Sequence, residues 1–116
     1  MEDIKKLLSS FYSLSIVAHM AHVNTKTYSF HIATGEFYDT VNETKDRLIE
    51  YLIGEKLIKE VSDLQISLKG DVVDVADGVA NLFCGWAKSM KHEALINMAG
   101  EFEEKVGHLK YLSFFK

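Results

Sequence analysis

Three histidines and two acids in the first half of the chain have the types and spacing of a metal site. His19, His22 and His31 come first, and Asp46 and Glu50 follow. The two acids are four residues apart, so on a helix their carboxylates lie on one face and can hold an ion together. Imidazole and carboxylate ligands suit iron, with zinc or manganese as alternatives. The competing interpretation is a solvated polar stripe, which the same residue types also form.

A long helix is needed to position these residues, and the sequence predicts one over residues 27–53. At about 100° per residue, its apolar residues fall on one face and His31, Asp46 and Glu50 fall on another. His31 and Asp46 are fifteen residues apart, which is about 22 Å along a helix. One ion cannot contact both within a single chain. The metal interpretation therefore predicts a homodimer, or a larger homo-oligomer, in which antiparallel copies of this helix share two identical sites.

The same spacings resemble those of the ferritin-like Dps proteins, small ferroxidases whose iron sites lie at a dimer interface. Their pattern is a histidine on the first helix, a second histidine twelve residues later, an aspartate fifteen further on and a glutamate four after that. His19, His31, Asp46 and Glu50 have these spacings. In a second register His22 is the first ligand, because residues 22–26 (HVNTK) are similar to the family's His-Trp-Asn-Val-Lys run. The choice between His19 and His22 stays open, and both are candidate ligands.

The resemblance implies a ferritin-like four-helix bundle that binds iron and, as a Dps-type ferroxidase, oxidises Fe(II) between the subunits of a dimer. Compact phage-encoded proteins with a similar His, His, His, Asp, Glu arrangement resemble the chain still more closely. The chain departs from the family pattern at Gly35, where the family carries an acid, and at Met20 and Val23, where the family has tryptophan. Because glycine provides no side-chain ligand at this position, the sequence does not support a second iron in each site. The short chain leaves the family's twelve-subunit shell unsupported as well.

The whole chain, residues 1–116, is predicted to form a single all-α domain. It contains no proline and 47% hydrophobic residues, which favours long uninterrupted helices. Apolar residues recur at three- and four-residue steps over 3–23, 27–53, 71–88 and 93–114, so we expect a four-helix bundle. Residues 55–70 are too apolar for a solvated linker, and a short helix starting near Ser62 is expected there. Their length fits either an up-down-up-down bundle or a crossover connection.

The net charge, the distribution of apolar residues and the cysteine content of the sequence indicate which classes of partner and which compartment to expect. The formal net charge is −4, which disfavours a nucleic-acid partner. Neither an apolar run of membrane-spanning length nor a signal-peptide pattern is present, so we expect no membrane partner and a cytoplasmic protein, in the host cytoplasm if it is viral. Cys84 is the single cysteine and is expected to pack as a small apolar residue. The alternative to an iron protein is a non-enzymatic dimeric helical bundle that acts as a binding or viral accessory protein.

Overall fold

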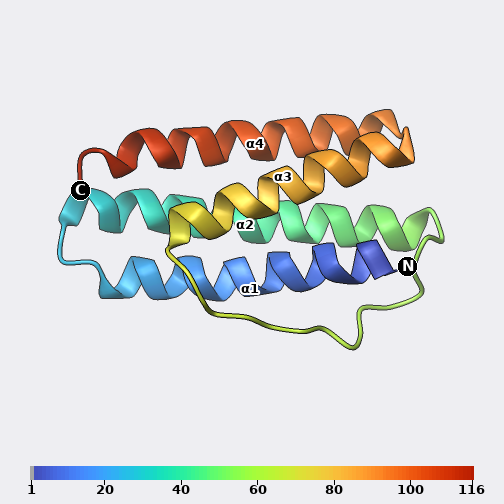
Figure 1. Cartoon of the computed structure of the whole chain (residues 1–116), viewed down its shortest axis with the longest axis horizontal. Helices are drawn as coiled ribbons and strands as arrows, with labels where there is room; N and C mark the ends of the chain where they lie inside the picture. The colour runs from blue at the N-terminus through green and yellow to red at the C-terminus, as the bar shows by residue number, and fades with distance from the viewer. Residues whose placement is uncertain (1) are drawn as a thin grey trace.

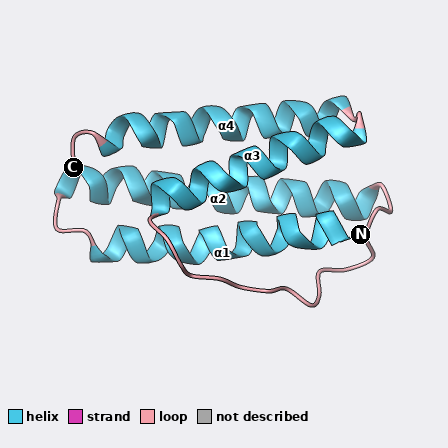
Figure 2. Ribbon diagram, viewed as in Figure 1, coloured by secondary structure: helices cyan, strands magenta, loops and turns pink. Residues whose placement is uncertain are grey.

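Four helices joined by loops make up the computed structural model, which describes residues 2–116 (Figure 2). They are α1 (Glu2–Asn24), α2 (Tyr28–Gly54), α3 (Val72–Met90) and α4 (Glu93–Ser113). Each bound lies within two residues of the range predicted from apolar periodicity, and residues 2–116 contain no strand. The prediction of an all-α four-helix bundle is confirmed. Within this range, no helix is both long enough and apolar enough to cross a membrane.

The helices form two antiparallel pairs joined by one long crossover. α1 packs against α2 and α3, and α4 packs against the same two helices. Figure 1 shows that α2 and α3 run in the same direction, so residues 55–71 return along most of the length of α1 before α3 begins. This is the connectivity of ferritin-like bundles, which have a single crossover between their two helix pairs. The structure therefore decides between the two topologies that the length of the connection allows.

Aromatic rings from all four helices fill the centre of the bundle. Phe11, Phe83 and Phe102 are fully buried, and the ring centroid of Phe11 lies 5.5 Å from that of Phe83 and 5.0 Å from that of Phe102. Phe37 of α2 joins them, 6.1 Å from Phe102. Because α2 turns this apolar face inward, the opposite face of α2 is left on the outside of the bundle.

The crossover is extended, so the short helix expected near Ser62 is wrong. A helix over residues 55–71 would cover only roughly 25 Å, whereas α1 is roughly 35 Å long. The extended chain also finds partners on α1. The backbone N–H of Gln65 donates to Ser9 Oγ and that of Ser67 donates to Ser13 Oγ, both at 3.0 Å. The spacings of donors and acceptors agree. Ser9 and Ser13 are four residues apart on a helix, and Gln65 and Ser67 are two residues apart in extended chain, and both separations are roughly 6 Å.

Candidate functional site

His22 and His31 form a reciprocal pair where α1 ends and α2 begins. The turn between the helices spans only residues 25–27, so the last turn of α1 lies beside the first turn of α2. His22 Nδ1 lies 2.7 Å from the carbonyl oxygen of His31, and His31 Nδ1 lies 2.8 Å from the carbonyl oxygen of His22. A carbonyl can only accept, so each Nδ1 carries a proton and donates it. In the neutral rings, both Nε2 atoms then keep the lone pair with which a histidine binds a metal.

The two rings are stacked, with centroids 4.0 Å apart and planes 17° from parallel. His22 reaches this position because its ring lies over Gly35. A Cβ built on Gly35 would be 2.8 Å from His22 Cε1 and 3.0 Å from His22 Nδ1, closer than van der Waals contact allows. This close approach is a physical reason for glycine at the position where the Dps pattern has an acid. An acid here would displace the ring that pairs with His31.

His19 lies one turn before His22 and is exposed. Its ring centroid is 6.4 Å from that of His22 and 5.0 Å from that of Tyr38. Both histidines line a shallow hollow on the outer surface of α1 and α2, together with Gly35 and Asp39. The structure thus places His22 beside His31, whereas His19 stands at the rim of the same hollow.

Asp46 and Glu50 lie on the outer face of α2, about four turns beyond His31. Both are exposed, and neither takes part in a hydrogen bond or an ion pair within residues 2–116. The basic residues next to them in sequence have other partners. Arg47 pairs with Glu101 at 3.0 Å, and Lys45 Nζ lies 4.3 Å from the ring centroid of Tyr12. The two carboxylates are therefore available to a cation or to another chain.

The five candidate ligands do not meet in one chain. Within the described part of the chain, no three His, Cys, Asp or Glu side chains are placed to hold a metal ion. The separation of His31 from Asp46 and Glu50 along α2 keeps the histidines and the carboxylates apart within one chain. The outer face of α2 between them carries two further exposed acids, Asp39 and Glu43.

Sequence reasoning missed two features that depend on tertiary packing. His92, at the start of α4, shares a hydrogen bond with the hydroxyl of Tyr51 through Nδ1 at 2.9 Å, which ties the end of α2 to the turn between α3 and α4. Nothing in the spacing of these residues indicates the contact. The carbonyl partners of His22 and His31 were likewise not expected, although the short turn between their helices was a signal that the rings would be close.

Cys84 is half-buried, and its Sγ donates to the carbonyl oxygen of Ala99 at 3.6 Å. Burial raises the pKa of the thiol, and the negative charge of Glu103 raises it further. A protonated, packed thiol is a poor nucleophile. This fits the interpretation of Cys84 as a small apolar residue.

Comparison of the chain with protein-family models, with curated proteins and with solved structures gives no match. The resemblance to Dps proteins therefore rests on the spacing of the candidate ligand residues, and the single crossover is a feature of ferritin-like bundles in general.

Proposed function

We propose that this protein binds a divalent metal ion, iron in the first place, between the two subunits of a homodimer. His31 with His22 or His19 of one copy would supply the imidazoles, and Asp46 and Glu50 of the other would supply the carboxylates. The observation that carries the proposal is the reciprocal pairing of His22 and His31, in which each Nδ1–H is held by a backbone carbonyl. Metal-binding histidines are oriented by such a hydrogen bond on the second ring nitrogen.

The position of the ligands along α2 supports a two-fold arrangement. The midpoint between His31 and the pair Asp46 and Glu50 falls next to Asp39. If two copies of α2 cross antiparallel near Asp39, the histidine end of each lies opposite the carboxylate end of the other. The same arrangement brings the exposed acids of the two copies close together, and like charges across an interface oppose association. We therefore expect metal binding and dimerisation to be coupled.

Fe(II) is the expected substrate if the protein is an enzyme. Histidine and carboxylate ligands suit Fe(II), and the two carboxylates favour the Fe(III) that forms when O2 or peroxide accepts its electron. In this role His31 and its histidine partner position the ion, while Asp46 and Glu50 offset its charge. Gly35 adds no ligand, so we expect one metal ion per site.

The test is a metal titration followed by light scattering and thermal unfolding. Anaerobic Fe(II), or Zn(II) as a redox-inert probe, should convert the wild type to a dimer at micromolar concentration and raise its melting temperature. At a free metal concentration of about 100 Kd the stabilisation is about 2.7 kcal/mol. Asp46→Asn with Glu50→Gln keeps the side-chain volumes and should abolish both effects. The matched control, Asp74→Asn with Glu104→Gln, removes two exposed carboxylates from α3 and α4 and should keep both effects.

A wild type that remains monomeric with metal, or a double variant that gains the same stabilisation, would contradict the proposal. A dimer that binds metal but oxidises Fe(II) no faster than buffer would show that the protein binds metal without acting as a ferroxidase. The second candidate is a non-enzymatic dimeric bundle with a binding or viral accessory role. The exposed carboxylates of α2, which have no partner within residues 2–116, suit the hydrated interface of such a protein as well as they suit a metal site. Oxygen added to anaerobically loaded protein separates the two, since only the ferroxidase consumes Fe(II) faster than buffer.

A further inference from the structure

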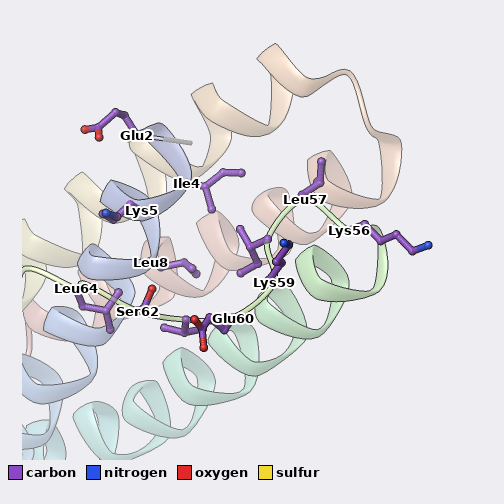
Figure 3. Close-up of a pocket in the computed structure, with 12 residues that line it drawn as sticks. Glu2, Ile4, Lys5, Leu8, Lys56, Leu57, Lys59, Glu60, Ser62 and Leu64 are labelled. Atoms are coloured by element: carbon purple, nitrogen blue, oxygen red, sulfur yellow. The ribbon is translucent and has the colours of Figure 1, made fainter.

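A pocket of about 450 Å3 lies between the first turns of α1 and the beginning of the crossover (Figure 3). It is at the opposite end of α1 from the histidines, which lie in the last turns of that helix. Its volume is within the range of small-molecule sites. Six of its twelve lining residues are aliphatic: Ile4, Leu8, Leu57, Ile58, Val61 and Leu64.

Hydrogen bonds anchor the crossover on both sides of this pocket. At one side the backbone N–H of Leu57 donates to the carbonyl oxygen of Leu52 at 2.9 Å. At the other side the N–H of Gln65 donates to Ser9 Oγ at 3.0 Å. Between these anchors the backbone turns at Asp63, whose φ is 55°, and Figure 1 shows the crossover bowing away from α1. The pocket is the space beneath this bow.

The pocket has an apolar base and a charged rim. Ile4 and Leu8 of α1 are 7% and 3% exposed, and the aliphatic residues of the crossover are half-buried against them. Three lysines and two glutamates complete the rim. In the view of Figure 3, Lys5 and Lys59 stand on opposite sides of Leu8, whereas Lys56 points away. None of these lysines forms an ion pair among residues 2–116, although the protein as a whole is acidic.

From this combination we infer that the pocket binds an amphipathic carboxylate, a medium-chain fatty acid. The alkyl chain lies against Ile4, Leu8 and Val61, where it removes apolar surface from water. The carboxylate lies at the rim between Lys5 and Lys59. A neutral or cationic head on the same chain loses this attraction, and a cationic head is also repelled by both lysines.

Binding is measured by titrating the full chain with decanoate below its micelle-forming range and following amide chemical shifts. We expect saturable shifts in residues 57–64 and in the first two turns of α1. From hexanoate to decanoate, each added methylene should tighten binding by about fourfold. Decanol should bind more weakly, and decyltrimethylammonium should not bind.

Three variants locate the head and the chain. Lys59→Glu should weaken decanoate binding by about tenfold, and Glu60→Gln should tighten it because a negative charge leaves the rim. Val61→Trp fills the pocket and should abolish binding, with circular dichroism confirming the fold. Lys69→Glu is the control, since Lys69 is an exposed lysine of the same crossover outside the pocket, and it should change the affinity less than twofold.

Equal binding of decanol and decanoate, equal weakening by Lys69→Glu, or shifts confined to other surfaces would overturn the inference. A sedimentation experiment with phosphatidylglycerol vesicles distinguishes binding of a free fatty acid from binding to a bilayer surface. Sedimentation with vesicles in the absence of any response to monomeric decanoate would overturn it as well. None of these outcomes depends on the metal proposal, because Asp46 and Glu50 are unchanged throughout.

Discussion

The two ends of the outer face of α2 are built in opposite ways. At the first end, His22 and His31 are half-buried, stacked and hydrogen-bonded to each other's backbone, with Gly35 leaving the space for the ring. At the second end, Asp46 and Glu50 are exposed and unpaired within residues 2–116. The histidine end is arranged by contacts within the chain, whereas no hydrogen bond or ion pair among residues 2–116 fixes the carboxylates. The histidine half of the candidate site is preorganised, and the carboxylate half is not held by contacts within residues 2–116.

This difference assigns unequal energetic roles to the two halves. Preorganised ligands lose little conformational freedom on binding, so most of their interaction energy is retained as affinity. Exposed acidic side chains lose more rotamer freedom when a metal holds them, and the longer Glu50 loses more than Asp46. A second subunit that brings the histidines to the carboxylates would therefore gain most from the histidine end. The predictions below test this division, beginning with the largest effect.

A mixing experiment gives the largest expected effect, because metal binding should be absent from two variants separately and return when they are mixed. It tests directly whether the two ends of α2 combine across subunits. One variant carries His22→Ala with His31→Ala, and the other carries Asp46→Asn with Glu50→Gln. Each alone should bind no metal. In a mixed dimer, one site has lost both ligand sets and the other is complete. Because neither variant can be joined to itself by metal, the mixed dimer is the favoured dimer, and an equimolar mixture should recover up to about half of the wild-type metal stoichiometry. The measurement is elemental analysis after dialysis, and mass spectrometry shows that mixed dimers have formed.

Each variant mixed with itself provides the control and should remain without metal. If mixed dimers form and bind none, the two ends do not share a site. If either variant alone binds as well as the wild type, the corresponding end of α2 supplies no ligand.

Two glycine substitutions should give effects of about 1 kcal/mol and separate the preorganised end from an ordinary helix surface. Gly78 lies in α3 with no atom within 4 Å of a built Cβ, so Gly78→Ala should raise the free energy of unfolding by about 1 kcal/mol through helix propensity. Gly35→Ala should lose this gain, because its Cβ would meet the His22 ring at 2.8 Å and weaken a hydrogen bond worth about 1 kcal/mol. Urea unfolding measures both.

The metal affinities of Gly35→Ala and Gly78→Ala should also differ. Gly35→Ala should weaken metal binding, since the His22 ring must move away from His31, while Gly78→Ala should leave it unchanged. If Gly35→Ala is stabilised as much as Gly78→Ala and binds metal normally, the arrangement of the two rings is not required for binding.

Periodicity was sufficient to predict the helices, because each has a buried stripe that repeats every three or four residues. It also placed His31 and Asp46 on one face of α2 at a separation that no single ion can bridge. These features depend on local geometry alone. The predicted bounds and the observed exposure of both acids agree with this reasoning.

What the sequence left undecided depends on contacts between distant segments. Ser9 and Ser13 appear in the sequence as weak helix formers, yet both are buried and accept hydrogen bonds from the crossover. No local pattern specifies that pairing, so neither the extended conformation of the crossover nor the topology was predictable. The role of Gly35 was equally hidden, because it depends on where the ring of His22 lies.

The smallest expected effect concerns the carboxylate end in the absence of metal. Asp46 and Glu50 carry like charges at positions i and i+4, which disfavours the helix by about 0.2–0.5 kcal/mol. Glu50 also lies near the last turn of α2, where a negative charge is opposed by the helix dipole. Asp46→Asn with Glu50→Gln should therefore raise the free energy of unfolding of the metal-free protein by about 0.5 kcal/mol, measured by urea unfolding in the presence of a chelator.

The comparison variant is Glu43→Gln, which removes an exposed acid near the middle of the same helix, four residues after Asp39 and three before Asp46. Because it relieves like-charge pairs of the same kind, it should raise the metal-free stability by a similar amount, roughly 0.2–0.5 kcal/mol, but it should leave metal binding intact. If Asp46 and Glu50 lower the free energy of unfolding without metal and raise it only with metal, they contribute to binding and not to folding. A loss of more than 1 kcal/mol in the metal-free double variant would show the reverse. Asp46 and Glu50 would then belong to the fold, as the histidine end does, and the contrast between the two ends of α2 would disappear.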